Sequence, residues 1–162
     1  MPIARTRQGL DLDGLETYLQ TGERPAFLYV MPTFHNPTGT TLSMADRERL
    51  ADLAIRHDLR LVEDDPYGLL RVDGEALPLM RDVLAGRGSV QLSIFISSFS
   101  KIVAPGLRVG YGVLPELLVD AVAAVAFETY VSPPLWPQAK IYEFLSAGHL
   151  PPHLIRVCGL LR

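Results

Sequence analysis

The sequence predicts an α/β fold built on part of a mainly parallel, doubly wound sheet. Short apolar runs alternate along the chain with longer segments of helical periodicity, and the most unusual polar side chains follow directly after the apolar runs. Strands that alternate with helices in this way form parallel sheets with helices on both faces. Hydrophobic residues make up 48% of the 162 positions and charged residues 20%, which is the composition of a chain that packs a core.

Helices are expected where apolar residues recur at intervals of three and four. Leu12, Leu15 and Leu19 show this spacing in the first helix, and Ser43 is placed to cap the second. In chain order, the expected helices cover 11–20, 43–57, 79–84, 115–130, 135–147 and a segment that begins near His153. The segments between them carry turn residues such as proline and glycine, which separate one element from the next.

Strands are expected at four apolar runs, and the segments that follow the first three are chemically distinctive. In chain order, the expected strands cover 26–32, 59–62, 90–96 and 108–113. The first three run into "PTFHNPTGT", "EDDPYG" and "SSFSK". In a parallel sheet, ligands gather outside the carboxyl ends of the strands. An amide, a carboxylate with a phenol, and a lysine with hydroxyls therefore face one rim of the predicted sheet.

Composition excludes several classes of function. Fifteen basic and eighteen acidic residues give a net charge of −3, without the cationic excess of proteins that bind nucleic acid. The single cysteine, Cys158, forms no internal disulfide, and no Cys and His spacing indicates a metal site. The first residues lack a signal-peptide core, and the most apolar helix, "ELLVDAVAAVAFE", is too short to cross a bilayer. We therefore expect a cytoplasmic protein that binds neither metal, membrane nor nucleic acid.

Each distinctive segment also has a plain interpretation. Taken alone, "NPTG" is typical of a turn, "EDD" of a solvated acidic corner, and a loop lysine or arginine of a solvated surface. Taken together, the groups match one small molecule. A lysine condenses with an aldehyde, a carboxylate keeps a heterocyclic nitrogen protonated, a phenol and an amide bond a ring oxygen, and hydroxyls with an arginine hold a phosphate. Pyridoxal 5'-phosphate is a molecule that requires all four of these interactions from a protein.

The motifs carry a family resemblance from about Leu10 to the end of the chain. In their order and separations, "YVMPTFHNPTGTTLS", "VEDDPYG" and "SSFSKIVAPGLRVGYGV" resemble fold-type I pyridoxal-phosphate-dependent aminotransferases of class I/II. The chain is most similar to the subgroup of 2-aminoadipate aminotransferases and the effector domains of MocR-type GntR-family regulators. The resemblance implies that the sheet is part of the aminotransferase large domain.

The resemblance also implies site residues. Lys101 would bind the cofactor aldehyde and later move the proton of the substrate α-carbon, Asp64 would pair with the ring nitrogen, and Tyr67 and Asn36 would bond the ring's phenolic oxygen. Asp64 is preferred to Asp65 because the family places this carboxylate three residues before the tyrosine. The phosphate would be held by two serines and an arginine. The implied cofactor-binding residues are Asn36, Asp64, Tyr67, Ser98, Ser100, Lys101 and Arg108.

Other chemistry-bearing residues near these motifs are expected to be structural. Glu63, beside Asp64, is interpreted as a structural carboxylate rather than a second catalytic one. His35, beside Asn36, could face a substrate but is better explained as a packed or solvated loop residue. No chemistry is assigned to His149 or His153.

The resemblance further predicts the organisation and partners of the chain. Residues 1–162 would form a single partial domain, the C-terminal half of the cofactor-binding large domain, ending near a hinge helix at about 135–162. The substrates would be an amino acid and a 2-oxo acid, and the full-length protein would be a homodimer. By itself, the chain is expected to bind the cofactor weakly and to show negligible transamination. The alternatives are a piece of a regulator that senses pyridoxal phosphate, or an inactive remnant.

Overall fold

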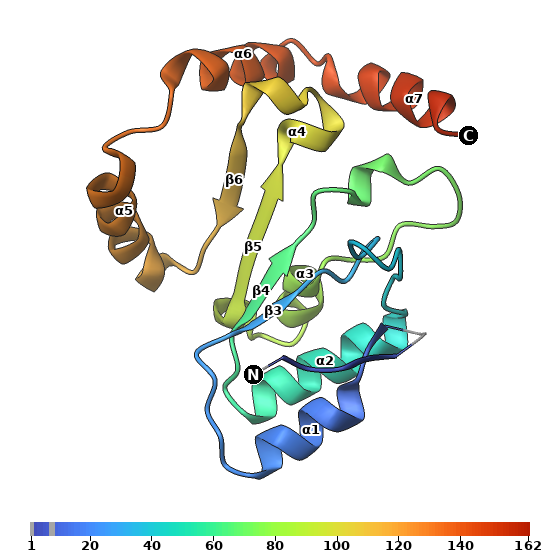
Figure 1. The fold of residues 1–162 in the computed structure, drawn as a ribbon, viewed down its shortest axis with the longest axis vertical. Helices are drawn as coiled ribbons and strands as arrows, with labels where there is room; N and C mark the ends of the chain where they lie inside the picture. The colour runs from blue at the N-terminus through green and yellow to red at the C-terminus, as the bar shows by residue number, and fades with distance from the viewer. Residues whose placement is uncertain (1, 7–8) are drawn as a thin grey trace. The chain divides into compact units, whose positions relative to one another are not determined.

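A computed structural model describes residues 2–6 and 9–162 and divides the chain into two units (Figure 1). Unit 1 comprises 1–65 and 77–95, and unit 2 comprises 66–76 and 96–162. Strand β5 (Ser93–Ser98) belongs to unit 1 through Phe95 and to unit 2 from Ile96. Each unit is described below by itself.

The main sheet has four strands in the order β3-β4-β5-β6. Strand β3 (Leu28–Val30) runs parallel to β4 (Leu61–Asp64), with Tyr29 opposite Val62. In Figure 1, β5 runs in the same direction as β4, whereas β6 (Gly110–Val113) runs opposite to β5. The predicted α/β class with a mainly parallel sheet is thus confirmed.

Two strands lie further along the chain than the apolar pattern predicts. Strand β4 was expected to end at Val62 but continues to Asp64, because the Glu63 side chain is buried inside the protein rather than solvated. The run expected as a strand over 90–96 begins with a short 3-10 helix, Val90–Leu92, and β5 then extends to Ser98. A pattern based on hydrophobicity misses the ends of these strands, because polar residues occupy them.

Unit 1 packs its helices on a single apolar core. Ser43 caps the second helix as predicted, since its Oγ accepts the N–H of Asp46 at 3.1 Å. Leu50 and Leu61 are fully buried in this core. The remaining elements of unit 1 are β1 (Arg5–Thr6), β2 (Gly9–Leu10), α1 (Leu12–Gln20), α2 (Met44–Arg56) and α3 (Met80–Ala85), of which β1 and β2 pair antiparallel. The sequence did not predict this small β1-β2 ladder.

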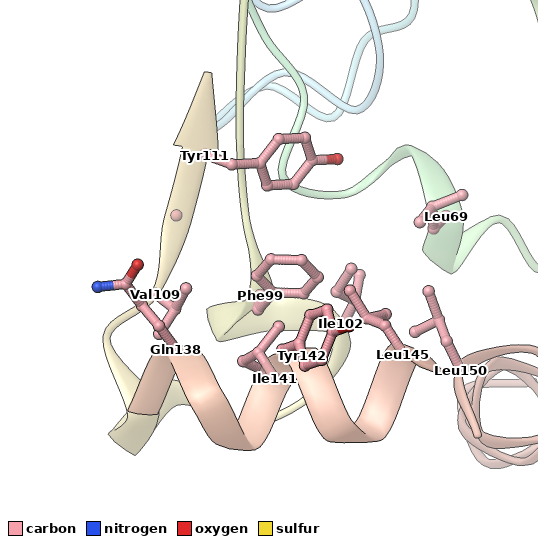
Figure 2. Close-up of a pocket in the computed structure, with 11 residues that line it drawn as sticks. Leu69, Phe99, Ile102, Val109, Tyr111, Gln138, Ile141, Tyr142, Leu145 and Leu150 are labelled. Atoms are coloured by element: carbon pink, nitrogen blue, oxygen red, sulfur yellow. The ribbon is translucent and has the colours of Figure 1, made fainter. Parts of the chain in front are cut away.

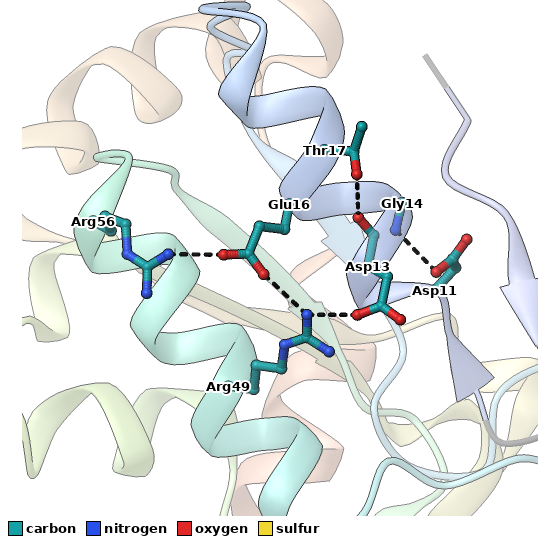
Figure 3. Close-up of polar contacts among 7 residues, drawn as sticks. All are labelled: Asp11, Asp13, Gly14, Glu16, Thr17, Arg49 and Arg56. Carbon is teal, nitrogen blue, oxygen red and sulfur yellow. Dashed lines mark hydrogen bonds and ion pairs between the residues drawn. The ribbon is translucent and has the colours of Figure 1, made fainter.

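Exposed ion pairs join α1 to α2 (Figure 3). Glu16 on α1 bonds both Arg49 at 2.9 Å and Arg56 at 2.8 Å, and Arg49 also reaches Asp13 at 2.6 Å. The two arginines lower the pKa of Glu16. Because these side chains are partly or fully exposed, the ion pairs add little to the stability of two helices that the apolar core already holds together.

Unit 2 has a smaller core, formed by Phe99, Ile102 and Ile141. Its last helix begins at Leu150, earlier than the expected start near His153. Prolines are tolerated there because the first-turn N–H groups of a helix have no helical partners. The elements of unit 2 besides β5 and β6 are the 3-10 helices Gly68–Leu70 and Pro105–Leu107, and α4 (Phe99–Ile102), α5 (Glu116–Tyr130), α6 (Leu135–Ser146) and α7 (Leu150–Leu160).

Candidate functional site

The predicted lysine lies on α4, a single helical turn that follows β5 directly. Ser98 caps this turn, because its Oγ accepts the N–H of Ser100 at 3.1 Å. Phe99 and Ile102 are buried on one side of the turn, so Lys101, which lies between them in the chain, is exposed. The apolar pair anchors α4 and leaves the Lys101 amine accessible for chemistry.

Arg108 and Ser100 come together at the end of the same loop. After the 3-10 turn at Pro105–Leu107, Arg108 adopts a left-handed backbone conformation with φ 53° and ψ 40°. Its Nη1 donates a hydrogen bond to Ser100 Oγ at 3.3 Å. The Arg108 guanidinium and the Ser100 hydroxyl form a pair of donors suited to an anion. The Ser98 hydroxyl donates to the Val109 carbonyl at 3.4 Å, and the N–H groups of Phe99 and Ser100 already have partners.

The fifth predicted residue of unit 2 is Tyr67. The Lys101 Nζ lies 5.9 Å from the centre of the Tyr67 ring, within the range of a cation–π contact. Unit 2 therefore groups five of the seven predicted residues: Tyr67, Ser98, Ser100, Lys101 and Arg108.

Unit 1 carries the other two, Asn36 in the turn after β3 and Asp64 at the end of the adjacent parallel strand β4. Asn36 is exposed in a turn that follows β3 and is closed by the Gly39 N–H donating to the His35 carbonyl at 2.6 Å. The expected turn at "NPTG" is present, whereas Asp64, expected just beyond its strand, is the last residue of β4.

Asp64 has a partner that sequence reasoning missed. The Tyr29 hydroxyl on β3 donates a hydrogen bond to Asp64 Oδ2 at 2.5 Å. Tyr29 and Asp64 lie on the same face of the sheet, because Tyr29 pairs with Val62 and alternate residues of a strand share a face. The motif "AFLYVMP" contains a polar group at this position, but only the strand register shows which residue it meets.

Glu63 is structural, as expected. Its side chain is fully buried and accepts the backbone N–H groups of Met80 at 3.0 Å and Arg81 at 3.3 Å, at the start of α3. Burial raises the pKa of Glu63 to about 7, although these N–H groups and the charge of Arg47 act against the rise. Adjacent carboxylates on β4 thus differ in role: Glu63 holds α3, whereas Asp64 bonds Tyr29.

The raised pKa of Glu63 makes the stability of unit 1 depend on pH. The folded carboxyl binds a proton more readily than the unfolded one, so the stabilisation is complete below pH 4.5 and is lost as the pH rises through about 7. The loss amounts to about 3 kcal/mol. Urea unfolding at pH 5 and pH 8 is expected to show this fall, and Glu63→Gln is expected to remove it.

The exposed Glu48 on α2 provides the control for that measurement. Glu48→Gln should retain the pH dependence of the unmodified chain. An unchanged slope in Glu63→Gln would contradict the assignment.

An apolar cavity of about 510 Å³ lies in unit 2 beside α4 (Figure 2). Phe99 and Ile102 of α4 face Ile141 and Tyr142 of α6 across it. Lys101 is not among the described residues that line it. The apolar residues that line the cavity therefore support α4, and the cavity is not part of the predicted cofactor site.

Comparison with known proteins identifies the family. The profile of the family "Aminotransferase class I and II" matches residues 2–141. The chain belongs to this aminotransferase family. A 2-aminoadipate transaminase of Thermus thermophilus is 39% identical over 149 residues, which cover 91% of this chain and 37% of that protein. The "Probable rhizopine catabolism regulatory protein MocR" of Rhizobium meliloti is 34% identical over 157 residues, which cover 97% and 30%.

A solved structure agrees with the family assignment. LysN, an α-aminoadipate aminotransferase of Thermus thermophilus crystallised with N-(5'-phosphopyridoxyl)-L-leucine, superposes with a TM-score of 0.91 at 32% identity, covering 98% of this chain and 40% of LysN. The resemblance that the motifs predict, to aminotransferases and to MocR-type regulators, is confirmed. This aminotransferase-family chain spans about a third of the length of the relatives it matches.

Within 2–6 and 9–162, no three His, Cys, Asp or Glu side chains are grouped as a metal site would require. In the same ranges, no helix combines the length and the apolar character needed to cross a membrane.

Proposed function

We propose that this chain is the part of an aminotransferase that binds pyridoxal 5'-phosphate through Lys101, and that the whole protein passes an amino group from an amino acid to a 2-oxo acid. The grouping of Lys101 with Ser100, Arg108 and Tyr67 in unit 2 is the observation that carries the proposal. Family membership supports it, as does the phosphopyridoxyl ligand of LysN.

The donor set fits this cofactor. Arg108 and Ser100 are hydrogen-bonded to each other, so a cation and a hydroxyl are already adjacent where a phosphate group would require both. Asp64 supplies a carboxylate for a protonated ring nitrogen, and Asn36 and Tyr67 supply an amide and a phenol for a ring oxygen. When bound, pyridoxal phosphate supplies an aldehyde and an electron-accepting ring.

The chain's own residues would then act as follows. Arg108 and the two serines bind the phosphate, and Asp64 holds the proton of the ring nitrogen. Lys101 Nζ would hold the cofactor at its aldehyde carbon, and the same Nζ would move the proton of the substrate α-carbon. The buried neighbours that anchor its helical turn and the exposure of its amine support both roles for Lys101.

Reductive labelling tests the proposal. The chain contains two lysines, Lys101 and Lys140. After addition of pyridoxal 5'-phosphate and borohydride, peptide mapping is expected to find the cofactor on Lys101. Lys140, on α6, lies with its Nζ 5.4 Å from the centre of the Trp136 ring and provides an internal control for non-specific reaction. Equal labelling of both lysines would rule out a specific cofactor site at Lys101.

A regulator that senses the cofactor is the second candidate, because MocR matches nearly the whole chain. Both candidates predict labelling of Lys101, but they differ in chemistry. An aminotransferase converts bound pyridoxal phosphate to pyridoxamine phosphate when amino acids are added to the full-length protein, whereas a sensor holds it unchanged. The absorbance of the bound cofactor, followed with a panel of amino acids, separates the two.

A further inference from the structure

The hydrogen bond between Tyr29 and Asp64 joins residues 35 positions apart in the chain. It depends on the parallel register of β3 and β4, which brings the two side chains to one face of the sheet. At 2.5 Å it is a short, charge-assisted contact, and bonds of this kind to a carboxylate are stronger than those between neutral groups. Tyr29 is about half exposed, so its aromatic ring is not required by the core of unit 1.

The phenol is suited to remain a donor. Desolvation and the adjacent Asp64 carboxylate raise the pKa of Tyr29 to about 12. The hydroxyl therefore keeps its proton at neutral pH. Its bond occupies Oδ2 of Asp64, and no residue in 2–6 or 9–162 donates a hydrogen bond to Oδ1. One carboxylate oxygen is thus held and the other is left for a further donor.

We propose that Tyr29 is a positioning residue that fixes the rotation of the Asp64 carboxylate, so that Oδ1 accepts the proton-bearing ring nitrogen of the cofactor. The inference rests on the proposed function, because it takes the ring nitrogen as the group that Asp64 binds. Tyr29 itself need not touch the cofactor. Without its hydroxyl, Asp64 rotates freely and must be ordered each time the ring binds, which weakens binding.

The test compares pyridoxal 5'-phosphate with an analogue in which carbon replaces the ring nitrogen. Tyr29→Phe is expected to weaken binding of pyridoxal 5'-phosphate about tenfold. It should change the affinity for the analogue by no more than about twofold, because the analogue has no nitrogen for Asp64 to bind. A tyrosine that only stabilised the fold would affect both ligands alike. Tyr18→Phe, on α1, is the matched control and should alter neither affinity.

A double-mutant cycle locates the effect at Asp64. Once Asp64→Asn has removed the carboxylate, adding Tyr29→Phe is expected to weaken cofactor binding no further. Equal losses for both ligands, or an undiminished loss in the Asp64→Asn background, would overturn the role of Tyr29 while Lys101 still became labelled. Failure of Lys101 labelling in the unmodified chain would instead overturn the proposed function and this inference with it.

Discussion

Replacing Lys101 with arginine is expected to abolish covalent retention of pyridoxal phosphate. Arginine keeps the positive charge, but its guanidinium does not condense with an aldehyde as an amine does. Intact mass after borohydride reduction should fall from one cofactor per chain to background. Because the same amine moves the proton of the α-carbon, the rate of any amino-acid half-reaction should also fall, by about 10³-fold or more relative to the unmodified protein.

Lys140→Arg is the matched control for this variant. It makes the same change at the other lysine, which lies beside Trp136 on α6. Mass labelling and half-reaction rate should remain at the level of the unmodified protein. Retention of the cofactor by Lys101→Arg together with its loss in Lys140→Arg would mean that the wrong lysine had been assigned.

Replacing Arg47 with methionine is expected to cost about 3–5 kcal/mol of unfolding free energy. The Arg47 guanidinium is fully buried on α2, and it donates to three backbone carbonyls and one hydroxyl. Its acceptors, at 2.8 to 3.2 Å, are Leu42 O, Pro78 O, Pro32 O and Thr33 Oγ1. Methionine fills similar space but leaves these buried acceptors, and the neighbouring Glu63 carboxylate, without a cation.

The control for Arg47 lies on the same helix. Arg56 is exposed and pairs with Glu16 at 2.8 Å, so Arg56→Met should cost no more than about 1 kcal/mol in the same urea titration. Equal losses for the two variants would show that burial of Arg47 does not matter. Because Pro32 and Thr33 lead into the turn that carries Asn36, the Arg47 variant should also weaken cofactor binding.

Helices were the most predictable part of this fold. The spacing of Leu12, Leu15 and Leu19 and the cap at Ser43 locate α1 and α2 almost to the residue, because these signals act within a turn or two of the chain. Strand limits were less predictable. The apolar run ends at Val62, but β4 continues through Glu63. The burial of Glu63 depends on N–H groups of α3, which lies further along the chain.

The site shows the same division. Motif order and separation located the lysine, the two serines and the arginine, and the structure brings Ser100 and Arg108 into contact. The helical turn that carries Lys101 was not expected, since its four residues are too few for a periodic signal. It forms because Ser98 caps it and because Phe99 and Ile102 are buried with Ile141 from α6.

The sequence by itself determined the family, the candidate lysine and the groups available to a cofactor, because reactive side chains at fixed separations are a local property. Only the tertiary structure decided how neighbouring carboxylates are used. Glu63 and Asp64 are adjacent, yet alternation along β4 turns the first into the core and the second toward Tyr29. Which partner each one meets depends on the register between strands and on helices far away in the chain, and hydrophobic periodicity carries no information about either.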